Sequence, residues 1–370
     1  MRAQRSAGPG PFVHAAFHRL GLVVTSTGSP FDVEGVLNPA AARDRSGRLL
    51  LYPRMVAAGN VSRIGLIRVA ETERGLEFGR ASILLEPEAD YELRGVPGGY
   101  GCEDPRVTFV PQLDAYVMAY TAFGPRGPRI ALAVSADAYS WHRLGLLRFA
   151  DDALNHVPNK DAAFFPEPVL SPSGVPSFAL YHRPMLAASV NGQAPISLIR
   201  SLPPDEREVT CIAYVPVENA LRDLGALRAP AESVRAIPVD PAWGALKNGA
   251  GTPPVRTSAG WLSVFHGVDA VDGPDGPALY YRAGIVVHDL ERPDRLVYRS
   301  PDPLIDPETP HERIGIVNDV VFPTGIDDRG NGRYDVYYGA ADARIARARI
   351  DVTFGESIRL RSALRAPSGP

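Results

Sequence analysis

Short alternations of apolar and polar residues, separated by turn residues, recur along the chain. Five of them follow a turn and end in aromatic and polar residues: SGRLLLYPR from Ser46, QLDAYVMAYTAF from Gln112, SGVPSFALYHRP from Ser173, SAGWLSVFHGV from Ser258 and NGRYDVYYGAAD from Asn331. Alternation with a period of two is typical of strands that bury one face. The pattern therefore predicts five equivalent β-strands.

A shorter strand-like segment with a polar or proline cluster precedes each of these runs: VLNPAAARD, CEDPRVTFVPQ, NKDAAFFPEPVLS, GAGTPPVRTS and VNDVVFPTGIDD. Two alternating runs joined by Gly, Ser, Asp or Asn residues predict a β-hairpin. A third strand is indicated after three of the hairpins, in SRIGLIRVAE, PRIALAVSAD and AGIVVHDL. Helix is expected to be sparse, with one helical turn near Glu218 to Leu224.

The five hairpins recur at intervals of about 60 to 85 residues, which suits four strands and their connecting loops. Five such units arranged radially make a five-bladed β-propeller, which leaves few open sheet edges. We therefore predict an all-β, single-domain propeller over residues 35–350. Residues 1–34 are expected to form an N-terminal extension and residues 351–370 a C-terminal strand or tail.

The composition of the chain argues against nucleic-acid-binding, disulfide-rich and membrane-spanning classes of protein. The chain has 370 residues, 45% of them hydrophobic, and a formal net charge of −3, which argues against a nucleic-acid partner. Its two cysteines, Cys102 and Cys211, are too few for a disulfide framework and favour a cytoplasmic location. The N-terminus lacks the apolar core of a secretory signal, and no run approaches the roughly 18 apolar residues of a membrane span, so no membrane partner is expected.

Two adjacent acids, Glu103 and Asp104, begin the inner strand of the second unit, in YGCEDPRVTFV. In a regular strand neighbouring side chains point to opposite faces, so only Asp104 is expected to face the central channel. A desolvated carboxyl there would hold a proton near neutral pH and act as a general acid. Glu103 would instead orient the turn, Arg106 or a sugar hydroxyl. The simpler interpretation is that an acid before proline caps a turn or pairs with Arg106.

The first strand of each propeller blade lines the channel, so its first polar residues are expected to converge there: Asn38, Asp104, Lys160, Thr252 and Asn318. Other polar groups end the second strands: Arg54, His182 with Arg183, His266 and Asp342. Singly, each would most often be a solvated loop charge or a structural histidine. Together, Lys160, Arg183 and His266 predict a cationic pocket opposite Asp104, suited to an anion such as phosphate.

Motifs for cofactors and metals are not found in the sequence. GPRGPR near Pro125 to Arg129 and GAGTPP from Gly249 lack the strand–turn–helix context of nucleotide-binding loops. The eight histidines show no metal-binding spacing. We expect neither a metal nor an organic cofactor.

A series of motifs, in order from about Gly35 to Ala343, resembles that of glycoside hydrolase family 130: GCEDPRVTF, NKDAAFFPE, ALYHRP, GAGTPPV, GWLSVFHGV, PETPHERIG, VVFPTG and VYYGAAD. Members of this family are mostly inverting β-mannoside phosphorylases built on a five-bladed propeller. The resemblance implies reversible phosphorolysis, in which an oligosaccharide β-mannoside and inorganic phosphate give α-mannose 1-phosphate and a shortened acceptor.

The resemblance also implies roles for individual residues. Asp104 matches the family's general acid, whose proton reaches the glycosidic oxygen through a hydroxyl of the mannosyl unit. Phosphate attacks from the opposite face and replaces the base of inverting hydrolases. The phosphate ligands implied are Lys160, Arg183, His266 and Tyr281, and the residues implied to hold the mannosyl unit are Asn38, Arg54 and Asp342.

Two alternatives stay open at this point. Some relatives are β-1,2-mannoside hydrolases that have lost phosphate ligands; the ligand positions here are filled, which favours phosphorolysis. A carbohydrate-binding propeller without catalysis is the second alternative, although it has no use for an acid that faces a cationic pocket. Asp319 and the GPRGPR loop depart from the family pattern, and such loops shape the acceptor site. Linkage, acceptor and a possible homo-oligomer, formed through the segments before Gly35 and after Ile350, are left undecided.

Overall fold

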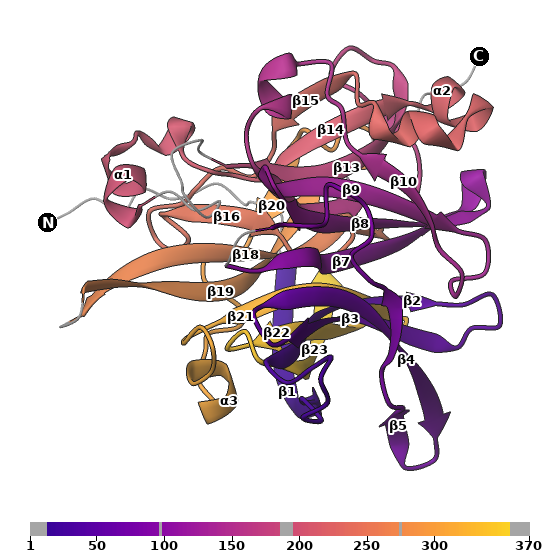
Figure 1. Cartoon of the computed structure of the whole chain (residues 1–370). Coiled ribbons are helices and arrows are strands. Elements are labelled where there is room, and N and C mark those ends of the chain that lie inside the picture. The colour runs from indigo at the N-terminus through magenta and orange to yellow at the C-terminus, as the bar shows by residue number, and fades with distance from the viewer. Residues whose placement is uncertain (1–12, 96–97, 186–194, 274–275, 356–370) are drawn as a thin grey trace, which may run out of the picture.

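The chain folds almost entirely into β-strands (Figure 1). The computed structural model describes residues 13–95, 98–185, 195–273 and 276–355. Four hydrogen-bonded sheets hold the strands, and paired strands run antiparallel apart from a short parallel contact between β4 and β7. The prediction of an all-β fold is confirmed.

All five predicted hairpins are present. They are β2 (Gly35–Arg43) with β3 (Leu49–Ala57), β7 (Tyr100–Val110) with β8 (Ala115–Gly124), β11 (Asn159–Phe164) with β13 (Pro176–Pro184), β16 (Lys247–Ala250) with β18 (Gly260–Gly273), and β21 (Val321–Asp328) with β22 (Arg333–Ala340). We call each hairpin, with the strands that extend it, a unit and number the units one to five along the chain.

A third strand extends every hairpin. Three of these strands were predicted, namely β4 (Val61–Thr72), β9 (Gly127–Ser135) and β19 (Gly276–His288), whereas β14 (Cys211–Pro216) and β23 (Arg344–Phe354) extend units three and five. Shorter strands complete the units: β5 (Gly75–Phe78), β6 (Ser82–Leu85), β10 (His142–Leu146), β12 (Val169–Leu170), β15 (Glu232–Arg235), β17 (Val255–Thr257) and β20 (Leu296–Arg299).

Strand β1 (Val13–Val24) pairs along its length with β23, from Val13 opposite Phe354 to Val24 opposite Ile345. Part of the predicted N-terminal extension is thus the outer strand of unit five. The division into residues 1–34, 35–350 and 351–370 stays a prediction, and its outer ends, 1–12 and 356–370, lie outside the described residues.

Helical structure is short. The helices are α1 (Ile196–Ser201), α2 (Val217–Arg222) and α3 (Pro310–Arg313), with 3-10 turns η1 (Pro111–Leu113), η2 (Asp152–Asn155), η3 (Pro204–Glu206) and η4 (Leu224–Arg228). The predicted turn near Glu218 to Leu224 corresponds to α2 and the start of η4. In the described part of the chain, no helix has the length and apolar character needed to cross a bilayer.

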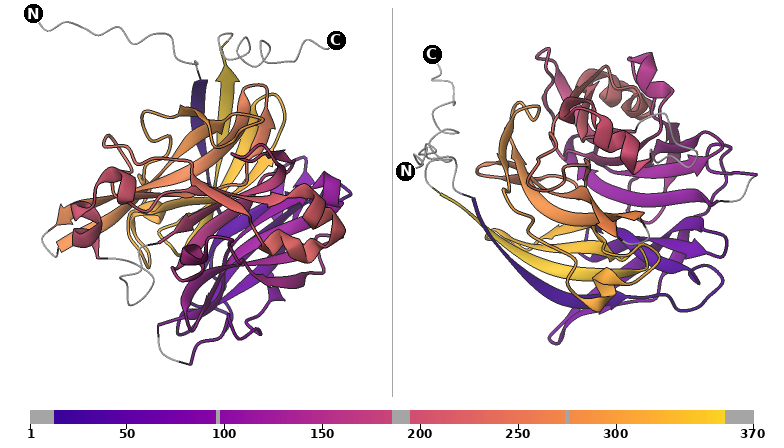
Figure 2. Two further views of the ribbon diagram at one scale, coloured as in Figure 1. Left: turned by 90° about the horizontal axis from the view of Figure 1, so that it is seen from above. Right: turned by 90° about the vertical axis from the view of Figure 1, so that its left-hand side faces the viewer.

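Apolar residues are packed between the units rather than around one centre. Each of five clusters joins two units, as these pairs illustrate: Tyr52 and Tyr116 for units one and two, Leu132 and Phe164 for two and three, Tyr181 and Trp261 for three and four, Val264 and Val336 for four and five, and Leu51 and Tyr337 for one and five. The contacts therefore return to the unit where they begin. Figure 2 shows the units following one another around the molecule, with the indigo strand β1 beside the yellow strands of unit five.

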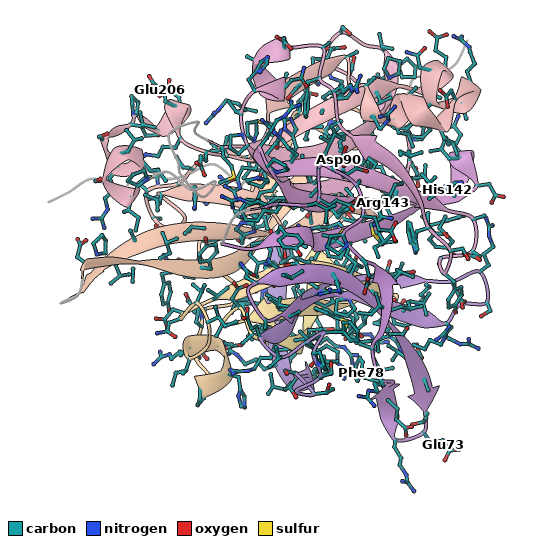
Figure 3. All side chains as sticks on the ribbon, viewed as in Figure 1. Glu73, Phe78, Asp90, His142, Arg143 and Glu206 are labelled. Atoms are coloured by element: carbon teal, nitrogen blue, oxygen red, sulfur yellow. The ribbon has the colours of Figure 1, made fainter. Side chains whose placement is uncertain are left out.

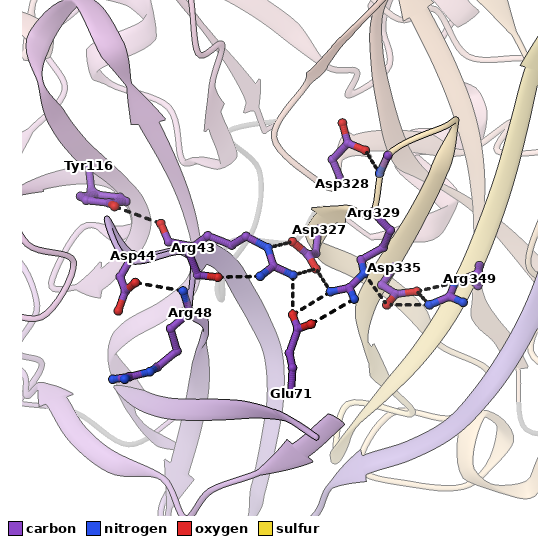
Figure 4. A network of polar contacts seen from close by, with 12 residues as sticks. Arg43, Asp44, Arg48, Glu71, Tyr116, Asp327, Asp328, Arg329, Asp335 and Arg349 are labelled. Carbon is purple, nitrogen blue, oxygen red and sulfur yellow. Dashed lines mark hydrogen bonds and ion pairs between the residues drawn. The ribbon is translucent and has the colours of Figure 1, made fainter. Parts of the chain in front are cut away.

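An ion-pair network also joins units one and five (Figure 4). At the end of β2, Arg43 donates to Asp327 of β21 at 2.7 Å and to Glu71 of β4 at 2.7 Å. Arg329 donates to the same Glu71 at 2.9 Å. These hydrogen bonds from Arg329 and Arg43 stabilise the charged form of Glu71 and lower its pKa to about 2.

We expect Glu71→Gln to destabilise the protein at pH 7 by about 0.5–1 kcal/mol, because the network is partly solvated. A depressed pKa contributes stability above the unfolded-state value of about 4.5, and this contribution is lost as pH falls towards 2. The difference in free energy of unfolding between wild type and variant should thus shrink between pH 5 and 3, which denaturant titration at several pH values measures. Glu73→Gln, at the tip of the β4–β5 hairpin (Figure 3), serves as the control. A pH-independent difference for Glu71→Gln would contradict the assignment.

Candidate active site

The inner strands of units one to three share one irregularity. In β7 the pairing steps from Glu103 opposite Thr121 to Arg106 opposite Ala119, so the inner strand holds one extra residue. Strands β2 and β11 have the same shift, between Leu37 and Ala40 and between Lys160 and Ala163. An extra residue on one strand is a β-bulge, which redirects the side chains around it.

An Asn or Asp in the left-handed backbone region lies within each bulge: Asn38 with φ +45°, Asp104 with φ +47° and Asp161 with φ +59°. Asn and Asp tolerate this region better than other residues with a side chain. The three residues occupy equivalent places, so Asp161 rather than Lys160 is the counterpart of Asp104. Lys160 corresponds to Glu103.

The bulge overturns the prediction that Glu103 and Asp104 point to opposite faces. Both carboxylates contact one guanidinium: Arg54 Nη2 donates to Glu103 Oε1 at 2.9 Å, and Arg54 Nη1 donates to Asp104 Oδ1 at 3.3 Å. Asn38 Nδ2 also donates to Asp104 Oδ1, at 2.8 Å. The alternation rule fails here because Asp104 is not in an extended conformation.

Arg54 is fixed by further acceptors. Its Nε donates to Ser62 Oγ at 2.9 Å, and its Nη2 donates to Asn60 Oδ1 at 3.2 Å. Ser62 belongs to the next strand, β4, and Asn60 to the turn before it, so unit one adds two acceptors to the two carboxylates of unit two. The sequence analysis missed both residues.

A cavity of about 300 Å³, which we call the central cavity, lies between the units. Its wall includes seven of the predicted site residues: Asn38, Arg54, Glu103, Asp104, Lys160, Tyr281 and Asp342. Phe123 and Phe322 give it aromatic sides. Four units contribute through their inner or second strands, while Tyr281 comes from β19 of unit four.

Thr252 and Asn318 do not reach this wall, so their predicted convergence is wrong. Thr252 is buried, and its hydroxyl accepts a hydrogen bond from Val264 N at 3.1 Å. Asn318 is exposed and accepts from Gly315 N at 3.2 Å. Asp319 lies beside the cavity only through its backbone, whose carbonyl accepts from Tyr281 N at 3.0 Å. The described pairing of β16 in unit four has no bulge, whereas β21 of unit five has its extra residue later, between Pro323 and Gly325.

The pKa values of the carboxyl groups in the central cavity are shifted in different directions. Burial is the largest influence on each and raises its pKa. For Glu103 and Asp342 burial prevails over the attraction of Arg54, so their pKa values are raised. For Asp104, Arg54, Arg106, Lys160 and the Asn38 hydrogen bond together prevail, and its pKa is lowered. The expectation that burial alone would keep Asp104 protonated is therefore wrong.

Asp161 organises the cations behind Lys160. Its Oδ2 accepts from Arg183 Nε at 2.7 Å and lies 3.7 Å from His266 Nε2, while its Oδ1 lies 3.6 Å from Arg106 Nη2. Arg183 Nη1 also donates to Glu208 Oε2 at 2.9 Å. Gly249 leaves the room for this cluster, because a Cβ there would lie 2.3 Å from Asp161 Oδ2 and 2.5 Å from the His266 ring.

The predicted cationic pocket is thus only partly cationic. Arg183 is buried between two carboxylates, and burial lowers the pKa of His266 to about 3, so its imidazole is neutral at pH 7. Lys160 and Tyr281 face the central cavity, whereas Arg183 and His266 stand behind its wall. Among the described residues, the Lys160 ammonium makes no hydrogen bond or ion pair, so it is available to a ligand.

Two residues near this cluster were missed by the sequence analysis, Asp161 and Lys247. Burial lowers the pKa of Lys247 to about 8, and its charged neighbours include Arg183 and Glu208. The composition could have indicated Lys247, because Lys160 and Lys247 are the only lysines among the 39 basic residues of the chain. The signal for Asp161 is the Asn or Asp that recurs in LNPA, EDPR and KDAA.

The side chains of the central cavity offer carboxyl, amide, guanidinium and ammonium groups, which suit a polar or anionic ligand. Within residues 13–95, 98–185, 195–273 and 276–355, no three His, Cys, Asp or Glu side chains are grouped to hold a metal ion. The chemistry offered is proton transfer by a carboxyl group and anion binding by Lys160 with its buried neighbours.

Comparisons with known proteins show the family of the chain. A family model for glycoside hydrolase family 130, described as beta-1,4-mannooligosaccharide phosphorylase, matches residues 18–354. The chain is 28% identical over 327 residues to a 1,2-beta-oligomannan phosphorylase of Thermoanaerobacter sp. (strain X514), covering 86% of this chain and 90% of the relative. It is 32% identical over 294 residues to a beta-1,2-mannobiose phosphorylase of the same strain, covering 78% of each.

Among solved structures, the fold is similar to that of beta-1,2-mannobiose phosphorylase from Listeria innocua in complex with beta-1,2-mannobiose. The TM-score is 0.67 at 21% identity, over 94% of this chain and 98% of that one. At this identity the likeness concerns the fold alone, but the family match extends over nearly the whole chain. The chain therefore belongs to glycoside hydrolase family 130.

Proposed function

We propose that the chain is an inverting phosphorylase, a hexosyltransferase that cleaves a β-mannoside with inorganic phosphate to give α-mannose 1-phosphate. The observation that carries this proposal is the charge arrangement of the central cavity. Its three carboxyl groups surround one guanidinium, Arg54, while the Lys160 ammonium faces the same cavity. The family description and the names of the relatives support the same activity.

Hydrolysis with inversion fits this arrangement less well. It requires two carboxyl groups on opposite faces of the sugar, about 6.5–9.5 Å apart, so that one activates water. Glu103 and Asp104 each lie within 3.3 Å of the same Arg54 guanidinium, so they stand on one side of any ligand. A charged nucleophile removes the need for a base.

Asp104 is the proposed general acid, with Asn38, Arg54, Glu103 and Asp342 holding the mannosyl unit. A general acid must carry a proton, yet the surrounding positive charges lower the pKa of Asp104. Bound phosphate would offset those charges, above all that of Lys160, and so raise the pKa. Glu103 and Asp104 interact, so protons leave the pair in two shared steps. Phosphate binding is thereby coupled to protonation of the acid.

Lys160 and Tyr281 are the proposed direct phosphate ligands. Arg183 and His266 stand behind them, and Asp161 holds both. A neutral imidazole still donates one N–H, so His266 needs no charge to bind an oxyanion. Arg183 turns towards phosphate at the expense of contacts with Asp161 or Glu208, which limits how tightly free phosphate binds.

The linkage is best approached through the relatives that align over most of the chain, which are named for β-1,2-linked mannosides. A Ruminococcus albus relative named beta-1,4-mannooligosaccharide phosphorylase is 36% identical, but the aligned segment covers only 29% of this chain. We therefore propose a β-1,2-mannoside as the first substrate to test, with β-1,4-mannosides and mannosyl-glucose as the alternatives.

We also propose that the five units form a five-bladed propeller. The five apolar clusters support this, because each joins neighbouring units and the last joins unit five to unit one. A cytoplasmic location is proposed from the two buried free cysteines, Cys102 and Cys211. A homo-oligomer stays a prediction.

Phosphate dependence is the first test. Purified protein with β-1,2-mannobiose should release α-mannose 1-phosphate in phosphate buffer and at least a hundredfold less sugar in phosphate-free buffer. Anion-exchange chromatography separates the phosphate ester from free mannose. Equal turnover in both buffers, with free mannose as product, would establish hydrolysis instead. Parallel reactions with β-1,4-mannobiose and mannosyl-glucose assign the linkage.

The two adjacent acids are distinguished by pH profiles. Asp104→Asn should lower kcat by about 10²–10⁴-fold, the usual contribution of a general acid. Glu103→Gln should keep activity but move the alkaline limb of kcat/KM to lower pH, because removal of a negative neighbour lowers the pKa of Asp104. Thermal melting checks that both variants fold. Loss of activity in Glu103→Gln with retention in Asp104→Asn would transfer the acid role to Glu103.

Lys160 is tested through the phosphate KM. Lys160→Ala should raise this KM by roughly 10–100-fold, the worth of one charge-assisted hydrogen bond. The KM for the mannoside should change less than threefold. Lys160→Arg, which keeps the charge, serves as the matched variant and should recover most of the phosphate affinity. An unchanged phosphate KM in Lys160→Ala would remove this residue from the phosphate site.

A further inference from the structure

A second cavity, of about 580 Å³, lies between units two and three. Five arginines line it: Arg126, Arg129, Arg143, Arg148 and Arg228. We call it the arginine cavity. Arg143, on β10, marks its place in Figure 3. The volume falls within the roughly 300–1,000 Å³ range of small-molecule sites.

The positive charge of this cavity is mostly uncompensated. Arg143 pairs with Glu92 at 2.9 Å and Glu88 at 3.1 Å. In the described part of the chain, the other four guanidiniums make no ion pair. Arg129 donates to the backbone carbonyl of Val157, and Arg228 Nε donates to that of Gly225 at 3.3 Å. A protein with a net charge of −3 thus concentrates cations at one place.

One of these cations, Arg129, is held in the cavity at a cost, and a second, Arg228, has space made for it. Arg129 is partly buried, and burial together with the neighbouring Arg126 lowers its pKa. Gly145 has φ +109°, and a Cβ on it would lie 3.0 Å from Arg228 Nη1. The absence of a side chain at Gly145 leaves room for the Arg228 guanidinium inside the cavity.

The turn between β8 and β9 separates this cavity from the central one. Phe123 and Pro128, which pair directly across the turn, line the central cavity. Arg126 and Arg129 of the same turn line the arginine cavity. The GPRGPR motif is therefore a partition with an apolar side towards the proposed sugar site and a basic side away from it. On β11, Asn159 lines the arginine cavity and Lys160 the central cavity.

We propose that the arginine cavity binds an anionic group, a phosphate or carboxylate, carried by the saccharide acceptor. Guanidinium forks match such oxyanions, and the shared turn places the anion beside the acceptor side of the central cavity. This inference rests on the proposed function, because an acceptor exists only if the enzyme transfers mannose. The acceptor class is then a sugar phosphate or a sugar acid.

Acceptor competition in the synthetic direction tests the proposal. With α-mannose 1-phosphate as donor, we expect kcat/KM for mannose 6-phosphate or glucuronic acid to exceed that for the matched neutral sugar, mannose or glucose, by tenfold or more. The double variant Arg126→Ala/Arg129→Ala should lose this preference and leave turnover of the neutral sugar unchanged. The control double variant Arg74→Ala/Arg80→Ala removes two exposed arginines elsewhere and should keep the preference. Arg148→Glu, a charge reversal at an exposed position of the same cavity, replaces the double variant if that one fails to fold.

Isothermal titration, which needs no turnover, separates the two proposals. Mannose 6-phosphate should bind wild type at least tenfold more tightly than mannose, and the difference should vanish in Arg126→Ala/Arg129→Ala. No preference for either anionic sugar, with normal turnover of neutral acceptors, would overturn the inference and leave the proposed function standing. Inorganic phosphate is titrated in the same way. If the double variant weakens its binding as much as that of mannose 6-phosphate, the cavity binds free anions rather than an anionic acceptor, and the inference is overturned. Absence of turnover with every acceptor would refute the proposed function itself.

Discussion

The site depends on one backbone constraint, the extra left-handed residue in the inner strands of units one to three. A regular strand would send Glu103 and Asp104 to opposite faces. With the bulge, both reach Arg54, and Asn38 reaches Asp104 from its own bulge in unit one. A left-handed conformation costs most residues about 1–2 kcal/mol, and less for Asn or Asp, whose short side chains make local hydrogen bonds. Gly339 complements this geometry, because a Cβ there would lie 1.8 Å from Asn38 Oδ1.

Charge balance follows from that geometry. Taking a charge out of water is expensive unless it is paired, so the buried cations of the site are almost all matched by carboxylates. Asp161 pairs with both Arg183 and Arg106 and lies beside the neutral His266, and Arg54 pairs with both Glu103 and Asp104. Groups fixed in this way need little reorganisation when charge develops during a reaction. Lys160 alone faces the central cavity without such a partner among the described residues, and this makes it the group through which a ligand changes the charge balance.

Much of the fold could be predicted because hairpins leave a local signal. All five pairs of strands were found from alternation and turn residues, and seven of the predicted site residues line one cavity. Errors arose where the backbone departs from its ideal form. Alternation misplaced Glu103, and treating Lys160 rather than Asp161 as the equivalent of Asp104 hid the residue that organises the cations. The protonation of Asp104 also lay beyond the sequence, because it depends on how burial compares with three cations and an amide brought together from distant segments.

The two cavities differ in the cations that lack an ion pair among the described residues: Lys160 in the central cavity, where Arg54 is paired with carboxylates, and arginines in the other. Only two of the 39 basic residues are lysines: Lys160 lines the central cavity, and Lys247 is buried among charged groups that include Arg183 and Glu208. An ammonium is a compact point charge with rotatable donors, whereas a guanidinium is a planar fork that fixes the orientation of its partner. Phosphate must enter the central cavity as a free anion and leave as a sugar ester, so its contacts have to survive a change in geometry. An acceptor held by an anionic group would instead gain from fixed orientation, which the arginines beyond the Pro125–Pro128 turn are suited to give.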